Sequence, residues 1–135
     1  MYNLRKSKKG FTLIELMVVV AIIGVLALLG LRLYTGQQAK AKEAIVKANA
    51  GTVQTLIQSE MADGPVPLAT AQTVAAAAGL RNPFAGTSMD DTTDFPSTAT
   101  LPGQVEIREI TSGIHYEVQG YGATGLIVEI LTARR

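Results

Sequence analysis

Apolar residues run almost without interruption from residue 11 to residue 31, and Glu15 is the single charged residue among them. As a helix, these residues extend over about 31 Å, close to the thickness of the hydrocarbon core of a bilayer. From residue 37 to 62, apolar residues instead recur at intervals of three and four. This spacing is typical of an amphipathic helix with one buried stripe. We therefore predict one long helix, apolar all round over 11–36 and amphipathic over 37–62.

The end of this helix and the next helix are also marked in the sequence. Asp63-Gly64-Pro65 predicts the end, because glycine favours a helix C-terminus and proline cannot continue the hydrogen-bond ladder. A short alanine-rich helix is predicted over 70–78, with Thr70 as its N-cap and Gly79 as its stop. The buried stripe of the long helix is predicted to contain Ile45, Val46, Val53, Leu56, Ile57 and Met61.

The rest of the chain has the pattern of a loop followed by strands. Pro, Gly, Ser, Thr and Asp are frequent over 81–103, which predicts a loop. Apolar and polar residues alternate over 104–110 and 114–120, and 126–132 is mostly apolar. Glycine-containing turns separate these runs, so we expect an antiparallel three-stranded meander. The predicted fold class is α+β: a long N-terminal helix whose amphipathic half packs on this small sheet.

Positive charge is concentrated at the start of the chain. Residues 1–10 contain four basic side chains and no acidic one, and the remaining residues carry a net charge of −3. Basic residues before an apolar span predict a cytoplasmic N-terminus, with the C-terminal side facing outward. The acidic balance of the remainder argues against a surface for nucleic acid, so no specific nucleic-acid partner is expected.

The composition excludes several kinds of site. The chain has no cysteine and one histidine, His115, which rules out disulfides, thiolate metal sites and clusters of several histidines. No nucleophile elbow, catalytic triad or glycine-rich phosphate loop is present, so neither an enzyme nor a cofactor is expected. Asp90, Asp91 and Asp94 are a weak candidate for calcium. Acidic residues in a polar loop are more often solvated, so no metal is assigned.

Glu15 is an unusual residue for an apolar span, because a charge in hydrocarbon is costly and a partner charge would explain it. From Gly10 to Gly24 the sequence is GFTLIELMVVVAIIG. The chain combines a basic leader, a glycine–phenylalanine junction and an acidic residue at the fifth position of the apolar run. In these features it resembles the type IV pilin family, which includes the pseudopilins of type II secretion. Asn82-Pro83-Phe84 is also similar to a loop of many pilin-like proteins.

The resemblance implies a role for each matched position. A prepilin peptidase would cut between Gly10 and Phe11, remove residues 1–10 and N-methylate the new terminus of Phe11. Glu15 would pair with the Phe11 ammonium group of a neighbouring subunit. The 11–36 helices would bundle in a filament core. The residues assigned to that packing are Leu13, Ile14, Leu16, Met17, Val20, Ile23 and Gly24.

The expected function is that of a structural subunit, a major pilin of a type IV pilus, with 37–135 as its globular domain. The resemblance implies a homo-oligomeric filament, an assembly ATPase and an inner-membrane platform. Subunits would wait in the cytoplasmic membrane and end in a cell-surface pilus. A pseudopilin of a type II secretion system is the alternative, and a membrane-anchored periplasmic binding module is a further one. A secretory signal peptide fits less well, because the apolar run exceeds the usual 7–15 residues.

Overall fold

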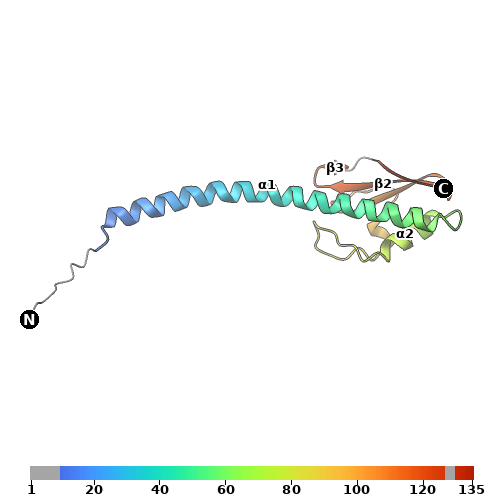
Figure 1. Cartoon of the computed structure of the whole chain (residues 1–135), viewed down its shortest axis with the longest axis horizontal. Coiled ribbons are helices and arrows are strands. Elements are labelled where there is room, and N and C mark those ends of the chain that lie inside the picture. The colour runs from blue at the N-terminus through green and yellow to red at the C-terminus, as the bar shows by residue number, and fades with distance from the viewer. Residues whose placement is uncertain (1–9, 127–129) are drawn as a thin grey trace, which may run out of the picture. The chain divides into compact units, whose positions relative to one another are not determined.

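The structure is a computed structural model that describes residues 10–126 and 130–135. The chain divides into two compact units, Met1–Gln37 and Gln38–Arg135. Helix α1 (Leu13–Glu60) contributes to both units, and all other described elements lie in the second (Figure 1). The predicted α+β class is confirmed: a long N-terminal helix packs, in the second unit, against a small antiparallel sheet.

The second half of α1 buries one stripe of side chains. Val46, Ala50, Val53 and Ile57 are fully buried, at the spacings of three and four that keep residues on one helix face. The prediction that Ile45 belongs to this stripe is wrong, because its side chain is 47 % exposed. The stripe runs through small Ala50 instead, and hydropathy alone does not distinguish this alanine from its neighbours.

Helix α2 (Leu68–Ala76) begins two residues before the predicted start. Thr70 is therefore not its N-cap. Pro67 occupies that position with extended backbone and no side-chain cap, and its carbonyl accepts hydrogen bonds from the backbone of Thr70 and Ala71. The helix starts here because proline breaks the preceding segment and leaves its own carbonyl free to begin a new ladder. Gly79 follows the helix with a φ of 66°, a conformation that glycine adopts readily.

The predicted loop over 81–103 contains one short 3-10 helix, η1 (Thr92–Asp94), and is otherwise irregular apart from an isolated bridge. Buried Asn82 fixes its course. The Asn82 side chain donates to Pro102 O (3.0 Å) and accepts from the backbone of Phe84 (2.9 Å) and Ala85 (3.1 Å). Gly103 lies so close that an added Cβ would be 1.8 Å from Asn82 Oδ1. Side-chain contacts of Asn82 thus hold this part of the loop in place of a regular hydrogen-bond ladder.

Buried Asn49 and Gln104 also form hydrogen bonds with the loop backbone. Asn49 of α1 donates to Arg81 O (3.0 Å). Gln104 accepts from the backbone of Thr100 and Leu101 and donates to Thr93 O, each at 3.0 Å. Buried backbone groups without such partners would be costly, so these side chains replace the ladder of a helix or sheet.

The sheet is centred on β2 (His115–Gly122). Strand β1 (Val105–Thr111) pairs with one edge of β2, and β3 (Gly125–Leu126) and β4 (Leu131–Arg134) pair with the other edge, all antiparallel. The third strand, predicted over 126–132, is thus two short strands, and residues 127–129 lie outside the described residues. Pairing continues to Arg134, two residues past the predicted end, because His115 is still available as its partner.

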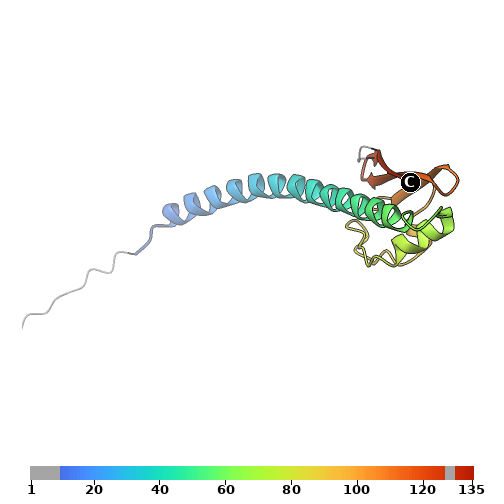
Figure 2. The same cartoon turned by 45° about the vertical axis from the view of Figure 1, so that its right-hand side comes forward.

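The core of the second unit brings together side chains from its helices, strands and loops. Figures 1 and 2 show the sheet and α2 beside the C-terminal part of α1. The core cluster draws its buried residues from α1, α2, three strands and the loops: Ala50, Val53, Ile57, Met61, Val66, Ala71, Ala75, Met89, Phe95, Val105, Ile107, Tyr116, Val118 and Ala133.

Tyr116 is the largest fully buried side chain of this core. Its hydroxyl donates to Val66 O, in the segment between α1 and α2, and also lies 3.2 Å from Glu109 Oε1. Burial and the nearby negative charge of Glu109 disfavour the phenolate and raise the pKa of Tyr116 to about 12. The hydroxyl therefore ties β2 to the helix connector only while it keeps its proton.

We predict that Tyr116→Phe lowers the free energy of unfolding by about 1–2 kcal/mol at pH 8, because Val66 O loses its donor. In the wild type, the unfolded tyrosine ionises near pH 10 and the folded one near pH 12, so stability present below pH 10 is lost between these values. The Tyr116→Phe variant should lose less stability than the wild type between pH 10 and pH 12. Denaturant unfolding at pH 8 and pH 11.5 measures both effects. The control Tyr121→Phe, on the same strand, should lose as much stability at pH 11.5 as the wild type does. If Tyr116→Phe also loses that much, the alkaline loss does not come from Tyr116.

Candidate processing and assembly site

Residues 10–12 lie directly before α1 and are not helical. Gly10 and Phe11 are exposed, and the Phe11 side chain is 83 % exposed. Thr12 is the last residue before the helix, and its carbonyl accepts a backbone hydrogen bond from Leu16 (3.3 Å). The peptide bond between Gly10 and Phe11 is therefore outside the helix and open to solvent.

Thr12 and Glu15 fix the point at which the helix begins. Thr12 Oγ1 accepts from the Glu15 backbone N–H (3.3 Å), and Glu15 Oε2 accepts from the Thr12 backbone N–H (3.0 Å). The Thr12 hydroxyl also donates to Glu15 Oε2 (2.8 Å). This reciprocal arrangement is a capping box, and it satisfies two donors that the first helical turn would otherwise leave free. The carboxylate also lies where the helix dipole favours negative charge.

The capping box gives Glu15 a partner that the sequence interpretation missed. That interpretation considered only a partner from another subunit. A threonine followed three residues later by glutamate, just before an apolar run, is the sequence signal that could have revealed it. Both of the Thr12 contacts use Oε2, and Glu15 Oε1 has no hydrogen-bond partner among residues 10–126 and 130–135. Among the described residues, only one of the two carboxylate oxygens is therefore in use.

The apolar part of α1 has no covering within the part of the chain that the structure describes. Every residue from 10 to 41 is exposed, and the large apolar side chains from Phe11 to Tyr34 are 46–83 % exposed. By length and composition, α1 is the one described helix that could cross a membrane. A surface of this kind needs lipid or other protein to shield it from water.

The residues assigned to filament packing occupy about half of the helix circumference, at 100° per residue. They are Leu13, Ile14, Leu16, Met17, Val20, Ile23 and Gly24, and all are exposed. By the same spacing, Glu15 lies on the opposite side of the helix from the centre of this set. Neighbours that packed on the set and also paired with Glu15 would have to surround the helix.

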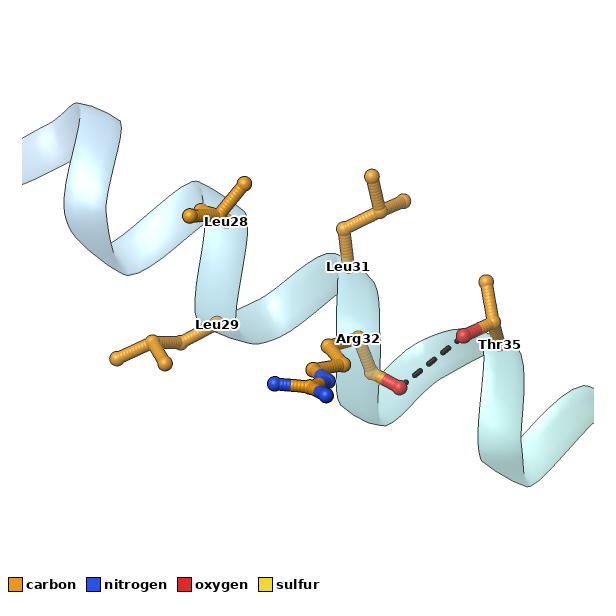
Figure 3. Close-up of a pocket in the computed structure, with 5 residues that line it drawn as sticks. All are labelled: Leu28, Leu29, Leu31, Arg32 and Thr35. Atoms are coloured by element: carbon orange, nitrogen blue, oxygen red, sulfur yellow. Dashed lines mark hydrogen bonds between the residues drawn. The ribbon is translucent and has the colours of Figure 1, made fainter.

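The apolar stretch ends at Arg32. Figure 3 shows Leu28, Leu29 and Leu31 projecting from the helix just before it, while the Thr35 hydroxyl donates to Arg32 O (3.1 Å). These five residues line an open groove on one side of α1. No other described segment lines the groove, so it is a packing surface of the bare helix and not an enclosed ligand site.

One of the three aspartates of the acidic loop caps a helix. Asp91 Oδ1 accepts from the Thr93 backbone N–H (3.0 Å) and so caps η1. This hydrogen bond lowers the pKa of Asp91. Over residues 10–126 and 130–135, no three His, Cys, Asp or Glu side chains are grouped in a way that could hold a metal ion. The weak calcium candidate of Asp90, Asp91 and Asp94 therefore gains no support.

Residues 5–31 match the family described as "Prokaryotic N-terminal methylation motif". Over 61 residues, the chain is 48 % identical to "Fimbrial protein EcpB" of Eikenella corrodens, covering 45 % of this chain and 38 % of that protein. It is 41 % identical over 61 residues to "Type IV major fimbrial protein FimA" of Dichelobacter nodosus, covering 45 % and 39 %. It is 37 % identical over 62 residues to "Type IV major alpha-pilin" of Moraxella bovis, covering 46 % and 39 %.

The predicted resemblance is confirmed: this chain carries the N-terminal methylation motif and has type IV pilin and fimbrial homologues at about 40 % identity. The similarity covers less than half of this chain and under two fifths of each relative named above. No solved structure matches the chain.

We predict that Thr12→Ala destabilises the first turn of α1 by about 1 kcal/mol, the usual contribution of an N-cap. The Glu15 amide, which donates to the Thr12 hydroxyl, should then exchange with solvent about fivefold faster. Amide exchange of the full chain in detergent micelles measures this rate. Thr12→Ser should keep the slow exchange, and Thr35→Ala, which removes a hydroxyl within the helix, is the matched control. An unchanged Glu15 rate in Thr12→Ala would rule out the capping box.

Proposed function

We propose that this chain is a structural subunit, a major pilin of a type IV pilus. One observation carries the proposal: the methylation motif spans residues 5–31 and leads into a helix whose apolar side chains are exposed on all sides. A helix of this kind needs other apolar surface around it. Lipid supplies that surface before assembly, and copies of the same helix supply it in a filament.

Processing would occur between Gly10 and Phe11, remove residues 1–10 and N-methylate Phe11. Exposure of this bond outside the helix supports the assignment, because a protease requires access to the backbone. The described part of the fold places no steric demand on Gly10. An added Cβ there would meet no heavy atom of residues 10–126 or 130–135 within 4 Å. The need for a small residue would then come from the peptidase.

After cleavage, Phe11 would carry a free ammonium group. Glu15 Oε1 is the acceptor that supports pairing with this group on a neighbouring subunit, because Thr12 occupies only Oε2. A carboxylate in a core of packed apolar helices is costly unless it is paired, whereas the net stabilisation from the pair itself can be small. The ion pair would mainly set the register between neighbouring subunits.

Residues 11–36 would form the membrane-spanning and filament-core segment, with 37–135 as the globular domain on the outside. The basic leader supports a cytoplasmic N-terminus before assembly. Moving the helix from lipid into a helix bundle changes its apolar burial little. Extraction therefore needs work from elsewhere, which an assembly ATPase and an inner-membrane platform would supply.

The pilin assignment is supported over a pseudopilin because the three relatives named above are all called fimbrial proteins or pilins. Electron microscopy of sheared surface material tests it. Long fibres composed mainly of this chain are expected. Short assemblies confined to the envelope would instead support a pseudopilin of a type II secretion system. A chain that forms no multimers would point to a membrane-anchored binding module.

We predict that Glu15→Ala leaves cleavage intact but lowers the yield of sheared filaments at least tenfold, because the filament core loses the carboxylate that pairs with Phe11. Immunoblotting of cell and sheared fractions measures both steps. Thr12→Ala keeps the carboxylate and loses only the cap, so it should assemble better than Glu15→Ala. Glu60→Ala, at the exposed end of α1, is the matched control. A normal filament yield from Glu15→Ala would refute the proposed ion pair.

We predict that Gly10→Leu leaves uncut precursor in the membrane, because the bulky side chain does not fit a narrow subsite of the peptidase. The fold has room for it, so the precursor should be as stable as the wild type. Mass spectrometry of the wild-type protein should show a mature chain that begins with N-methylated Phe11. A different first residue would refute the cleavage assignment.

A further inference from the structure

Side chains of α1 hold the C-terminal strand β4 on its outer side, where no other described strand pairs with it. Gln54 Nε2 donates to Thr132 O (2.9 Å), and Gln58 Nε2 donates to Arg134 O. Gln58 Oε1 also accepts from the Arg134 backbone N–H (3.0 Å). Gln58 thus pairs with both backbone groups of Arg134, as a residue of a neighbouring strand would.

The spacing of the two glutamines fits the strand. Four residues of an α-helix rise about 6 Å, and two residues of a strand rise about 6.7 Å. Gln54 and Gln58 are four residues apart, and Thr132 and Arg134 are two residues apart, so both side chains reach their partners at once. Figures 1 and 2 show the C-terminus beside this part of α1 in both views.

Apart from these contacts, β4 has limited support: partly buried Leu131 packs on the core, Arg134 Nε donates to His115 Nε2 (3.3 Å), and the Arg135 backbone N–H donates to Ile114 O (3.2 Å). It has four residues, which pair with His115–Val118 of β2, and Ala133 is its one fully buried side chain. Short strands at a sheet edge with little apolar burial open most easily. The edge of β2 that β4 occupies would then be free to accept another strand of the same sequence.

The ligand that fits this edge is the C-terminal strand of a second copy of the chain, because its sequence and register are those of β4 itself. Exchange of identical elements between two copies, known as domain swapping, links the copies at little cost in free energy. In the proposed filament, neighbouring copies would be at very high local concentration, so this step rests on the proposed function. We propose that Gln54 and Gln58 form a lock that keeps β4 in its own subunit and excludes the C-terminal strand of a second copy.

The test uses the full chain in detergent micelles and a fluorescent peptide with the sequence of residues 130–135, ILTARR. Fluorescence anisotropy measures peptide binding to the wild type and to the double variant Gln54→Ala/Gln58→Ala. Alanine keeps α1 helical. The double variant should bind the peptide at least tenfold more tightly than the wild type. Gln37→Ala, the same change at an exposed position of α1, should bind like the wild type.

Amide exchange of the same samples shows whether the effect is local. In the double variant, the Arg134 amide should lose its protection, while the amides that pair β1 with β2 keep theirs. Equal peptide binding by the double variant and the wild type would overturn the proposal. Loss of protection across β1 and β2 as well would also overturn it, because the glutamines would then support the whole sheet. Neither result depends on filament formation, so failure of the lock is distinct from failure of the pilin assignment.

Discussion

The C-terminal unit depends on the burial of one narrow stripe of α1. Val46, Ala50, Val53 and Ile57 are fully buried there, and most of this stripe lies in the cluster that contains the buried residues of α2, the loops and the sheet. Burying apolar surface is the main favourable term in folding, and short strands or a nine-residue helix cannot bury enough alone. The small elements are therefore stable only as a layer on this helix. Polar contacts from the same helix, those of Asn49 and the two glutamines, then hold Arg81 of the loop and strand β4.

The first unit is built on the opposite balance. Its apolar surface is exposed, so its order comes from the backbone hydrogen bonds of the helix and not from a core. The Thr12–Glu15 capping box defines that start, and it uses one carboxylate oxygen while leaving the other without a partner among the described residues. Under the proposed function, the same side chain would cap its own helix and offer its second oxygen to a neighbouring copy. That double use would account for a charged residue in a segment that is otherwise suited to lipid.

Periodicity predicted the long helix, the paired strands and the apolar span, because each depends on patterns that are local in sequence. It failed where the outcome depends on which distant backbone comes near. Asn49, Asn82 and Gln104 look like solvated polar residues in the sequence, yet they are buried because loop carbonyls and amides lie beside them. The resemblance to pilins indicated the candidate site but gave Glu15 only an external partner. The Thr12 contact was local and predictable, whereas the roles of Gln54 and Gln58 required the position of β4.

Asn82 illustrates a chemical consequence of where a structural residue sits. Its amide carries three hydrogen bonds of the loop, so conversion to aspartate would remove the donor to Pro102 O and place an acid at a buried position. Asparagine usually deamidates when the backbone nitrogen of the next residue attacks the side chain. Here the next residue is Pro83, whose nitrogen carries no hydrogen. The residue that shapes the loop is thus protected from this route of deamidation by its own neighbour in sequence.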